Sequence, residues 1–139
     1  MWYYGDVEFT SEMINDYTGF VYVITDLNNK KKYVGKKLFN STRRLAPLKG
    51  KTRKRKVVKE SDWKDYFGSS EEVKLILEEN GRESFHREII HLCGSKGEMS
   101  YLEAKEQFDR EVLLSDEYYN GIINCKIHRT HVKGLKDDK

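Results

Sequence analysis

A run of β-branched and aromatic residues near the N-terminus constrains the fold most strongly. The segment Gly19-Phe-Val-Tyr-Val-Ile-Thr25 has the composition of a buried strand. Turn-forming residues follow it from Asp26 to Lys30, and Lys31-Lys-Tyr-Val-Gly35 has the pattern of a short second strand. The two segments together predict a β-hairpin around which the rest of the chain has to pack.

The length of the hairpin loop decides whether two tyrosines share a face of the sheet. If Asn28-Asn29 is a two-residue turn, Ile24 pairs with Tyr33 and Tyr22 becomes a diagonal neighbour of Tyr33 on the same face. A three-residue loop would send the two tyrosines to opposite faces. The sequence leaves both loops open.

Three further elements are expected after the hairpin. Ser69 and Glu72 form a capping box for a helix that ends near Asn80-Gly81. Residues 85–92 have the pattern of a third strand. Ser100 and Glu103 form a second capping box, and a helical stripe continues through apolar positions 101, 104, 108 and 112. The prediction is a small α/β domain with a three-stranded, mostly antiparallel sheet, flanked by helices.

The domain boundaries follow from these patterns. Residues 1–18 show no clear periodicity and are interpreted as an N-terminal extension. The domain is expected over residues 19–124, interrupted by a basic insertion at 45–60 whose Pro47 and Gly50 oppose a continuous helix. Residues 125–139 form a polar, basic tail.

The positive charge of the chain is concentrated in one segment. Nine Lys and Arg residues lie from Arg43 to Lys59 without an acidic residue among them, which leaves 17 of the 26 basic residues against all 23 acidic residues elsewhere. A basic segment on an acidic body indicates that a polyanionic partner binds at one defined place. We favour a segment that contacts nucleic acid over one that is only a solvated loop.

Composition also excludes several classes of protein. Disorder is not expected, because 12% of the residues are aromatic and the net charge is only +3. No apolar run is long enough for a transmembrane span, so no membrane partner is expected. The N-terminus has no signal-peptide pattern, and the two cysteines are too few for a disulfide scaffold. These features predict a cytoplasmic protein.

The hairpin also carries a family resemblance. Phe20-Val-Tyr22, followed after ten residues by Tyr33-Val-Gly35, resembles the paired signature of the GIY-YIG nuclease superfamily, although Phe-Val replaces the usual Gly-Ile. The remaining elements of that family occur in its usual order: an arginine, which family members place at the start of a helix (Arg43), a helical glutamate (Glu103 or Glu106) and a closing Tyr-Asn pair (119–120). Within the superfamily the chain is most similar to phage-encoded, Seg-like homing endonucleases, which would place it in the host-cell cytoplasm.

The resemblance implies a set of catalytic residues. Tyr22 would activate or orient the attacking water with help from Tyr33, and Asn120 would have a positioning or structural role. Arg43 would clamp the phosphate, because a guanidinium matches phosphate oxygens bidentately. Glu103 would hold the metal, expected to be Mg²⁺ or Mn²⁺.

Two of these assignments keep an alternative. Arg44 competes with Arg43, and Glu106 competes with Glu103, since Glu103 is also explained as part of the Ser100 capping box. DNA contacts are expected from Lys36 and Lys37 after the hairpin and from basic residues of the insertion: Arg44, Lys49, Lys51, Arg53, Lys54, Arg55 and Lys56.

The expected function is therefore metal-dependent hydrolysis of phosphodiester bonds in DNA. Low intrinsic sequence specificity is expected, because no second DNA-binding module is evident after residue 120. The alternative is a nucleic-acid-binding module on the same scaffold without catalysis. The sequence leaves the oligomeric state open.

Overall fold

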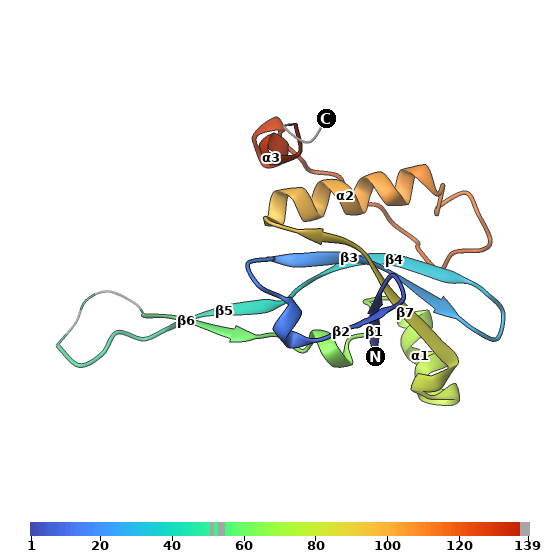
Figure 1. The fold of residues 1–139 in the computed structure, drawn as a ribbon, viewed down its shortest axis with the longest axis horizontal. Coiled ribbons are helices and arrows are strands. Elements are labelled where there is room, and N and C mark those ends of the chain that lie inside the picture. Colours follow the sequence, from blue (N-terminus) through green and yellow to red (C-terminus); the bar gives the residue numbers. More distant parts are fainter. Residues whose placement is uncertain (51, 53–54, 137–139) are drawn as a thin grey trace.

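The computed structural model describes residues 1–50, 52 and 55–136, with the side chains of residues 43–45, 55, 56 and 136 excepted. Its centre is a five-stranded mixed sheet in the order β2-β1-β7-β3-β4 (Figure 1). The strands are β1 (Trp2–Tyr4), β2 (Val7–Phe9), β3 (Gly19–Asp26), β4 (Lys32–Leu38) and β7 (Phe85–Cys93). The predicted hairpin and third strand are confirmed as β3, β4 and β7.

The hairpin has the register that places both tyrosines on one face. Ile24 pairs with Tyr33 in the antiparallel β3–β4 ladder, as the two-residue turn predicted. The ladder closes at Asp26, whose N–H donates to the carbonyl of Lys31 at 2.8 Å. Tyr22 and Tyr33 are therefore neighbours, with ring centroids 6.3 Å apart.

The expectation of a three-stranded sheet was wrong, because the N-terminal residues add two strands. β1 pairs in parallel with β7 and antiparallel with β2. Each has three residues, and Gly5 turns between them at a positive φ of 63°. Strands this short cannot show a recognisable alternation, which explains why the sequence did not reveal them.

Two helices cover opposite faces of the sheet: α1 (Glu71–Asn80) and α2 (Lys96–Asp109) (Figure 1). Neither begins at its predicted cap. The N-cap of α1 is Ser70, whose side chain accepts from the N–H of Val73, and the N-cap of α2 is Ser95. Ser100 is therefore an interior residue of α2, and Glu103 has no capping role.

Four 3₁₀ turns and a short C-terminal helix accompany the sheet and these two helices. The turns are η1 (Ser11–Met13), η2 (Trp63–Asp65), η3 (Arg82–Ser84) and η4 (Arg129–Val132), and the helix is α3 (Lys133–Lys136). In the described part of the chain, no helix has the length and apolar character needed to cross a membrane.

The sheet separates two hydrophobic clusters because side chains alternate along β3. Phe20, Tyr22 and Ile24 point toward the α1 face, where they pack with Trp2 and Trp63 among others. Val21 and Val23 point the other way, toward a smaller cluster that includes Val34 and Met99. The side chain of Tyr22 therefore leaves the sheet on the face opposite α2.

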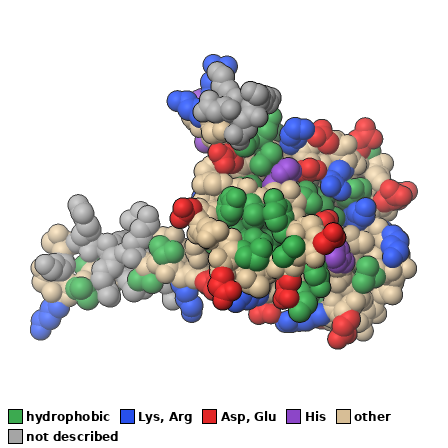
Figure 2. Space-filling model, viewed as in Figure 1, with side chains coloured by type: hydrophobic (Ala, Val, Ile, Leu, Met, Phe, Trp, Pro, Cys, Tyr) green, Lys and Arg blue, Asp and Glu red, His purple; other side chains and the backbone are tan. Residues whose placement is uncertain are grey.

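The basic insertion is a two-stranded arm made of β5 (Asn40–Leu45) and β6 (Arg55–Glu60). It stands clear of the body, with apolar and basic side chains exposed along it (Figures 1 and 2). The expectation that residues 45–60 do not form a continuous helix is confirmed.

Candidate active site

A cavity of about 220 Å³ opens at the β4 edge of the sheet. It is lined by side chains from β3, β4, α2 and the segment before α1, among them Tyr22, Tyr33, Lys36, Ser69, Glu103 and Gln107. Three of the predicted catalytic residues, the two tyrosines and Glu103, therefore meet in one place. We call this space the tyrosine–glutamate cavity.

The absence of a side chain at Gly35 allows Tyr22 to reach the cavity. Tyr22 is only 1% exposed, and its ring runs from β3 toward the neighbouring strand β4. A Cβ atom on Gly35 would collide with the Tyr22 hydroxyl. The glycine of the second signature triplet thus makes room for the tyrosine of the first.

Tyr33 is held by a hydrogen bond from the segment before α1. Its hydroxyl lies 2.8 Å from Oγ of Ser69. Gly68, next to this serine, has a positive φ of 90°, and a Cβ there would lie 3.2 Å from the Tyr33 ring. The close approach of this loop fixes the orientation of the Tyr33 phenol.

Both phenols are neutral at neutral pH in this environment. Burial raises the pKa of Tyr22 well above its usual value of 10, and the nearby phenols of Tyr66 and Tyr33 add to the effect. Burial also raises the pKa of Tyr33, although its hydrogen bond with Ser69 opposes the shift. The tyrosines are therefore hydrogen-bonding groups rather than ready-made bases.

Glu103 enters the cavity from α2, beside a lysine. Its side chain is 13% exposed, and its carboxylate lies 3.8 Å from Nζ of Lys36. The same ammonium donates to Oγ of Ser100 at 2.8 Å. Burial raises the pKa of Glu103, and the charge of Lys36 partly counters this rise. The carboxylate is thus accessible at the cavity and stabilised by a neighbouring cation.

Glu106 points to different partners, one turn further along α2. Its carboxylate oxygens lie 3.1 Å from Nε2 of His91 and 3.1 Å from Nε of Arg110. Burial alone would raise the pKa of Glu106, but these two partners more than offset it, so the pKa is lowered. Glu106 does not line the cavity, and the geometry favours Glu103 as the candidate ligand.

A comparison with protein families decides the relationship of this chain. The family model described as "Putative endonuclease segE, GIY-YIG domain" matches residues 2–123. The chain belongs to this Seg-like GIY-YIG family. Searches among curated proteins and solved structures gave no match.

The match to the GIY-YIG family includes the N-terminal strands. It begins at Trp2, the first residue of β1, and ends at Ile123, shortly after the Tyr-Asn pair. The sheet edge formed by β1 and β2 is therefore part of the matched domain.

Asn120 holds the edge of the GIY-YIG sheet and does not line the tyrosine–glutamate cavity. Its Oδ1 accepts from the N–H of Val34 at 3.0 Å, and its Nδ2 donates to the carbonyl of Val34 at 2.8 Å. Asn120 therefore satisfies the backbone groups of Val34 on the outer edge of β4. This geometry fits the structural role among those expected for it.

The candidate phosphate clamp lies in a different element than the resemblance implied. Family members place an arginine at the start of a helix, but Arg43 and Arg44 lie in strand β5. Their side chains are outside the described part of the structure, as are those of Arg55 and Lys56 in β6. Lys51, Arg53 and Lys54 lie outside the described residues altogether, whereas Lys49 is exposed on the arm.

The two lysines after the hairpin have different partners. Lys36 faces Glu103 and Ser100, as described above. Lys37 points to the opposite face of β4, where its Nζ lies 2.7 Å from a carboxylate oxygen of Asp62 and 4.2 Å from the ring centroid of Tyr66. Of the two, Lys36 is the one that lines the cavity.

Sequence reasoning missed several residues that line the cavity, including Ser69 and Gln107. Gln107 is 4% exposed, and its Nε2 donates to the carbonyl of Val34 at 3.0 Å. It lies four residues after Glu103, so the helical period was a usable signal for placing both on one face. Ser69 gave no such signal, because its pairing with Tyr33 depends on the loop before α1.

The cavity offers one carboxylate to a metal ion. Among the described residues, no group of three or more His, Cys, Asp or Glu side chains is arranged to hold a metal. Mg²⁺ commonly keeps several waters and takes only one or two carboxylates from the protein. Glu103 in a polar cavity therefore fits a largely hydrated divalent ion better than an ion fully enclosed by protein ligands.

Proposed function

We propose that the tyrosine–glutamate cavity is the active site of a metal-dependent DNA endonuclease. The observation that carries the proposal is the meeting of Tyr22, Tyr33 and Glu103 in one cavity next to Lys36. The two tyrosines belong to the cluster on the α1 face of the sheet, whereas Glu103 comes from α2 on the other face, so the cavity joins groups from both sides of the sheet. Membership in a family described as endonucleases supports the same reaction.

The tyrosines orient the water that attacks phosphorus. A neutral phenol can accept one hydrogen bond from water while donating its own proton elsewhere. Tyr22 has the more buried hydroxyl, and Tyr33 is oriented by Ser69 at 2.8 Å. We assign to Tyr22 the hydrogen bond that orients the attacking water, and to Tyr33 an assisting hydrogen bond. The water attacks phosphorus directly, so no covalent intermediate forms between protein and DNA.

The positive groups stabilise the phosphate. A divalent ion, Mg²⁺ or Mn²⁺, held by Glu103 would neutralise phosphate charge and favour departure of the 3′-oxygen. Lys36 lies 3.8 Å from the Glu103 carboxylate, where its charge opposes the rise in the pKa of Glu103 caused by burial, and it adds a positive charge to the cavity. Arg43, with Arg44 as its alternative, is proposed as the phosphate clamp, because only one residue separates β5 from β4.

The arm supplies affinity for DNA with little preference for sequence. Lysines and arginines that neutralise phosphates release counterions, and this contribution does not depend on the bases. Nine basic residues without an acidic one from Arg43 to Lys59 provide such a contribution. We therefore expect cut sites scattered over many sequences, and sharply defined sites from the purified protein would contradict this part of the proposal.

Cleavage of supercoiled plasmid tests the proposal. The wild type is expected to nick or linearise the plasmid with Mg²⁺ or Mn²⁺ but not with EDTA. Tyr22→Phe and Glu103→Gln should each lower the rate on the order of 10²-fold or more. Glu106→Gln is the matched control on the same helix, and its cleavage rate should fall far less.

Thermal unfolding of each variant establishes that the protein is folded. A folded wild type that binds DNA but cleaves neither duplex nor branched DNA would favour the alternative, a binding module without catalysis. An equal fall in cleavage rate in Glu103→Gln and Glu106→Gln would contradict the assignment of Glu103.

A further inference from the structure

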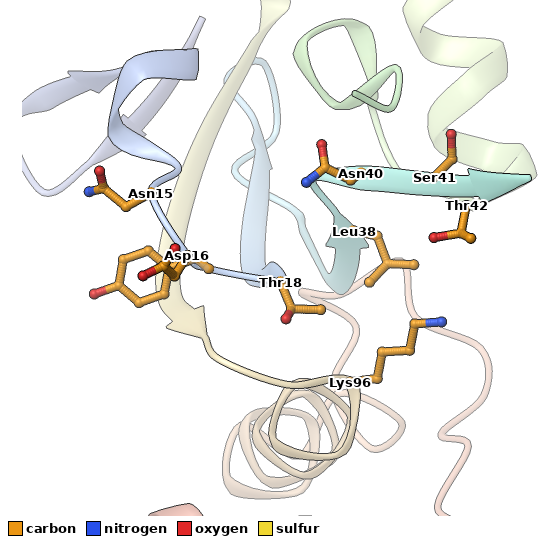
Figure 3. Close-up of a pocket in the computed structure, with 9 residues that line it drawn as sticks. Asn15, Asp16, Thr18, Leu38, Asn40, Ser41, Thr42 and Lys96 are labelled. Carbon is orange, nitrogen blue, oxygen red and sulfur yellow. The ribbon is translucent and has the colours of Figure 1, made fainter. Parts of the chain in front are cut away.

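Two more hollows continue from the tyrosine–glutamate cavity to the base of the arm. The first, about 380 Å³, is lined by Lys36, Lys37, Leu38, Lys96, Met99 and Ser100, and we call it the lysine hollow. The second, about 560 Å³, lies between residues 15–18 before β3, strand β5 and the start of α2, and we call it the arm-base hollow (Figure 3).

These three spaces are neighbours because they share lining residues. Lys36 lines both the tyrosine–glutamate cavity and the lysine hollow. Leu38 and Lys96 line both the lysine hollow and the arm-base hollow. The three spaces therefore adjoin one another in series between the candidate active site and the base of the arm.

Lys96 is the cation of this path without an ion-pair partner in the described part of the protein. Lys36 is paired with Glu103, and Lys37 is paired with Asp62. Lys96 is exposed and forms no ion pair with any described residue. Figure 3 shows its side chain reaching from α2 toward Leu38 and Thr42.

The position of Lys96 in its helix argues against a role in stability. It is the first residue of α2, where the helix dipole presents partial positive charge. A lysine at this place is electrostatically unfavourable for the helix. Its charge is better explained by an anion in the adjoining hollow than by folding.

The remaining lining of the arm-base hollow suits a phosphate backbone. Its polar side chains include Thr18, Asn40, Ser41 and Thr42, and side chains of these types commonly contact phosphate oxygens in DNA complexes. One acidic residue, Asp16, also lines the hollow, and it lies on the side away from Lys96 (Figure 3).

We propose that one DNA strand runs from the tyrosine–glutamate cavity through the lysine hollow into the arm-base hollow, with Lys96 bound to a backbone phosphate. This inference rests on the proposed function for its ligand, and it adds the direction in which the substrate leaves the active site. The strand passes between α2 and β5 and meets the basic arm beyond.

Binding of a fluorescent DNA duplex, measured by anisotropy in EDTA at several salt concentrations, tests the path without cleavage. Lys96→Ala should lower affinity about tenfold at 0.1 M salt and reduce the slope of log K against log salt by about 0.9, the effect of removing one phosphate neutralisation. Lys96→Arg should retain most of the affinity. Lys105→Ala is the matched control, since it removes an exposed lysine of the same helix that lines none of the three hollows.

A second variant tests the arm-base hollow itself. Thr42→Glu places a negative charge in the hollow and should also weaken binding, whereas the melting temperature of Lys96→Ala should stay equal or rise slightly. If the wild type binds and cleaves DNA but Lys96→Ala behaves like Lys105→Ala, the path is overturned and the proposed function stands. If the wild type binds no DNA, both proposals fail.

Discussion

The body and the arm of this protein place their apolar residues in opposite ways. In the body, aromatic rings pack against one another, as in the cluster of Phe20, Phe39 and Trp63 with centroid distances of 4.8 to 6.2 Å. In the arm, Val57 and Val58 are 39% and 61% exposed on a two-stranded ribbon. A ribbon of this kind is marginally stable without packing partners.

This contrast separates stability from affinity. The body buries the side chains that hold the fold and positions the tyrosines and Glu103 within it. The arm segment carries nine of the 26 basic residues of the sequence, and none of its described residues belongs to the two core clusters. Substitutions in the two regions are therefore expected to affect different measurements, and they are taken below from the strongest expected effect to the weakest.

Trp2→Ala should destabilise the protein by about 3–5 kcal/mol, because large aromatic side chains in a core cost this much when they are removed. Trp2 is 2% exposed, and its Nε1 donates to the carbonyl of Trp63 at 2.6 Å. Val58→Ala in the arm should change the free energy of unfolding by less than about 0.5 kcal/mol. Urea denaturation measures both, and equal effects would remove the distinction between body and arm.

Gly35→Ala should lower the cleavage rate on the order of 10²-fold, because the new methyl group displaces the Tyr22 hydroxyl from its position. Gly121→Ala is the matched control, since a Cβ at Gly121 meets no atom within 4 Å. Single-turnover cleavage with Mg²⁺ measures the effect. A Gly35→Ala protein that folds and cleaves at the wild-type rate would show that Tyr22 need not occupy this place.

Replacing residues 46–54 by a two-residue Asn-Gly turn removes four lysines and arginines from the tip of the arm. The salt slope of DNA binding should fall by up to about 0.9 for each phosphate that these residues neutralise in the wild type. The melting temperature should stay within a few degrees of the wild type. An unchanged salt slope would show that the arm does not touch DNA in the complex.

The two cysteines should differ in their reaction with a thiol reagent. Burial raises the pKa of the Cys93 thiol to about 12, and its side chain is packed in the smaller core cluster, whereas Cys125 is exposed. Mass spectrometry after mild labelling should find modification at Cys125 and little at Cys93. Rapid labelling of Cys93 would mean that the α2 side of the core opens readily.

The sequence predicted the elements whose signals are local. The β3–β4 hairpin and β7 followed from runs of β-branched residues and from turn chemistry. The register of the hairpin did not, because two loop lengths were compatible with the sequence, and only the structure places Tyr22 and Tyr33 on one face.

The remaining features depend on contacts between distant segments. The helix α2 begins at Lys96, five residues before the predicted start, because Ser95 and not Ser100 caps it. The predicted apolar stripe was wrong at one position, since Phe108 is 57% exposed and Gln107 is buried, whereas Ala104 and Val112 are buried as expected. The burial of Gln107 follows from its hydrogen bond to Val34, and the sequence around α2 does not reveal that partner.

The central claim is that the tip of the arm, residues 46–54, supplies affinity while the chemistry lies elsewhere, and it is tested by measuring binding and cleavage on one labelled duplex. Glu103→Gln should bind the duplex with nearly wild-type affinity and cleave it on the order of 10²-fold more slowly at saturation. The arm truncation should bind more weakly but cleave near the wild-type rate once the duplex saturates the protein. If the truncation remains slow at saturating DNA, or if Glu103→Gln loses binding and cleavage together, the division between body and arm is contradicted.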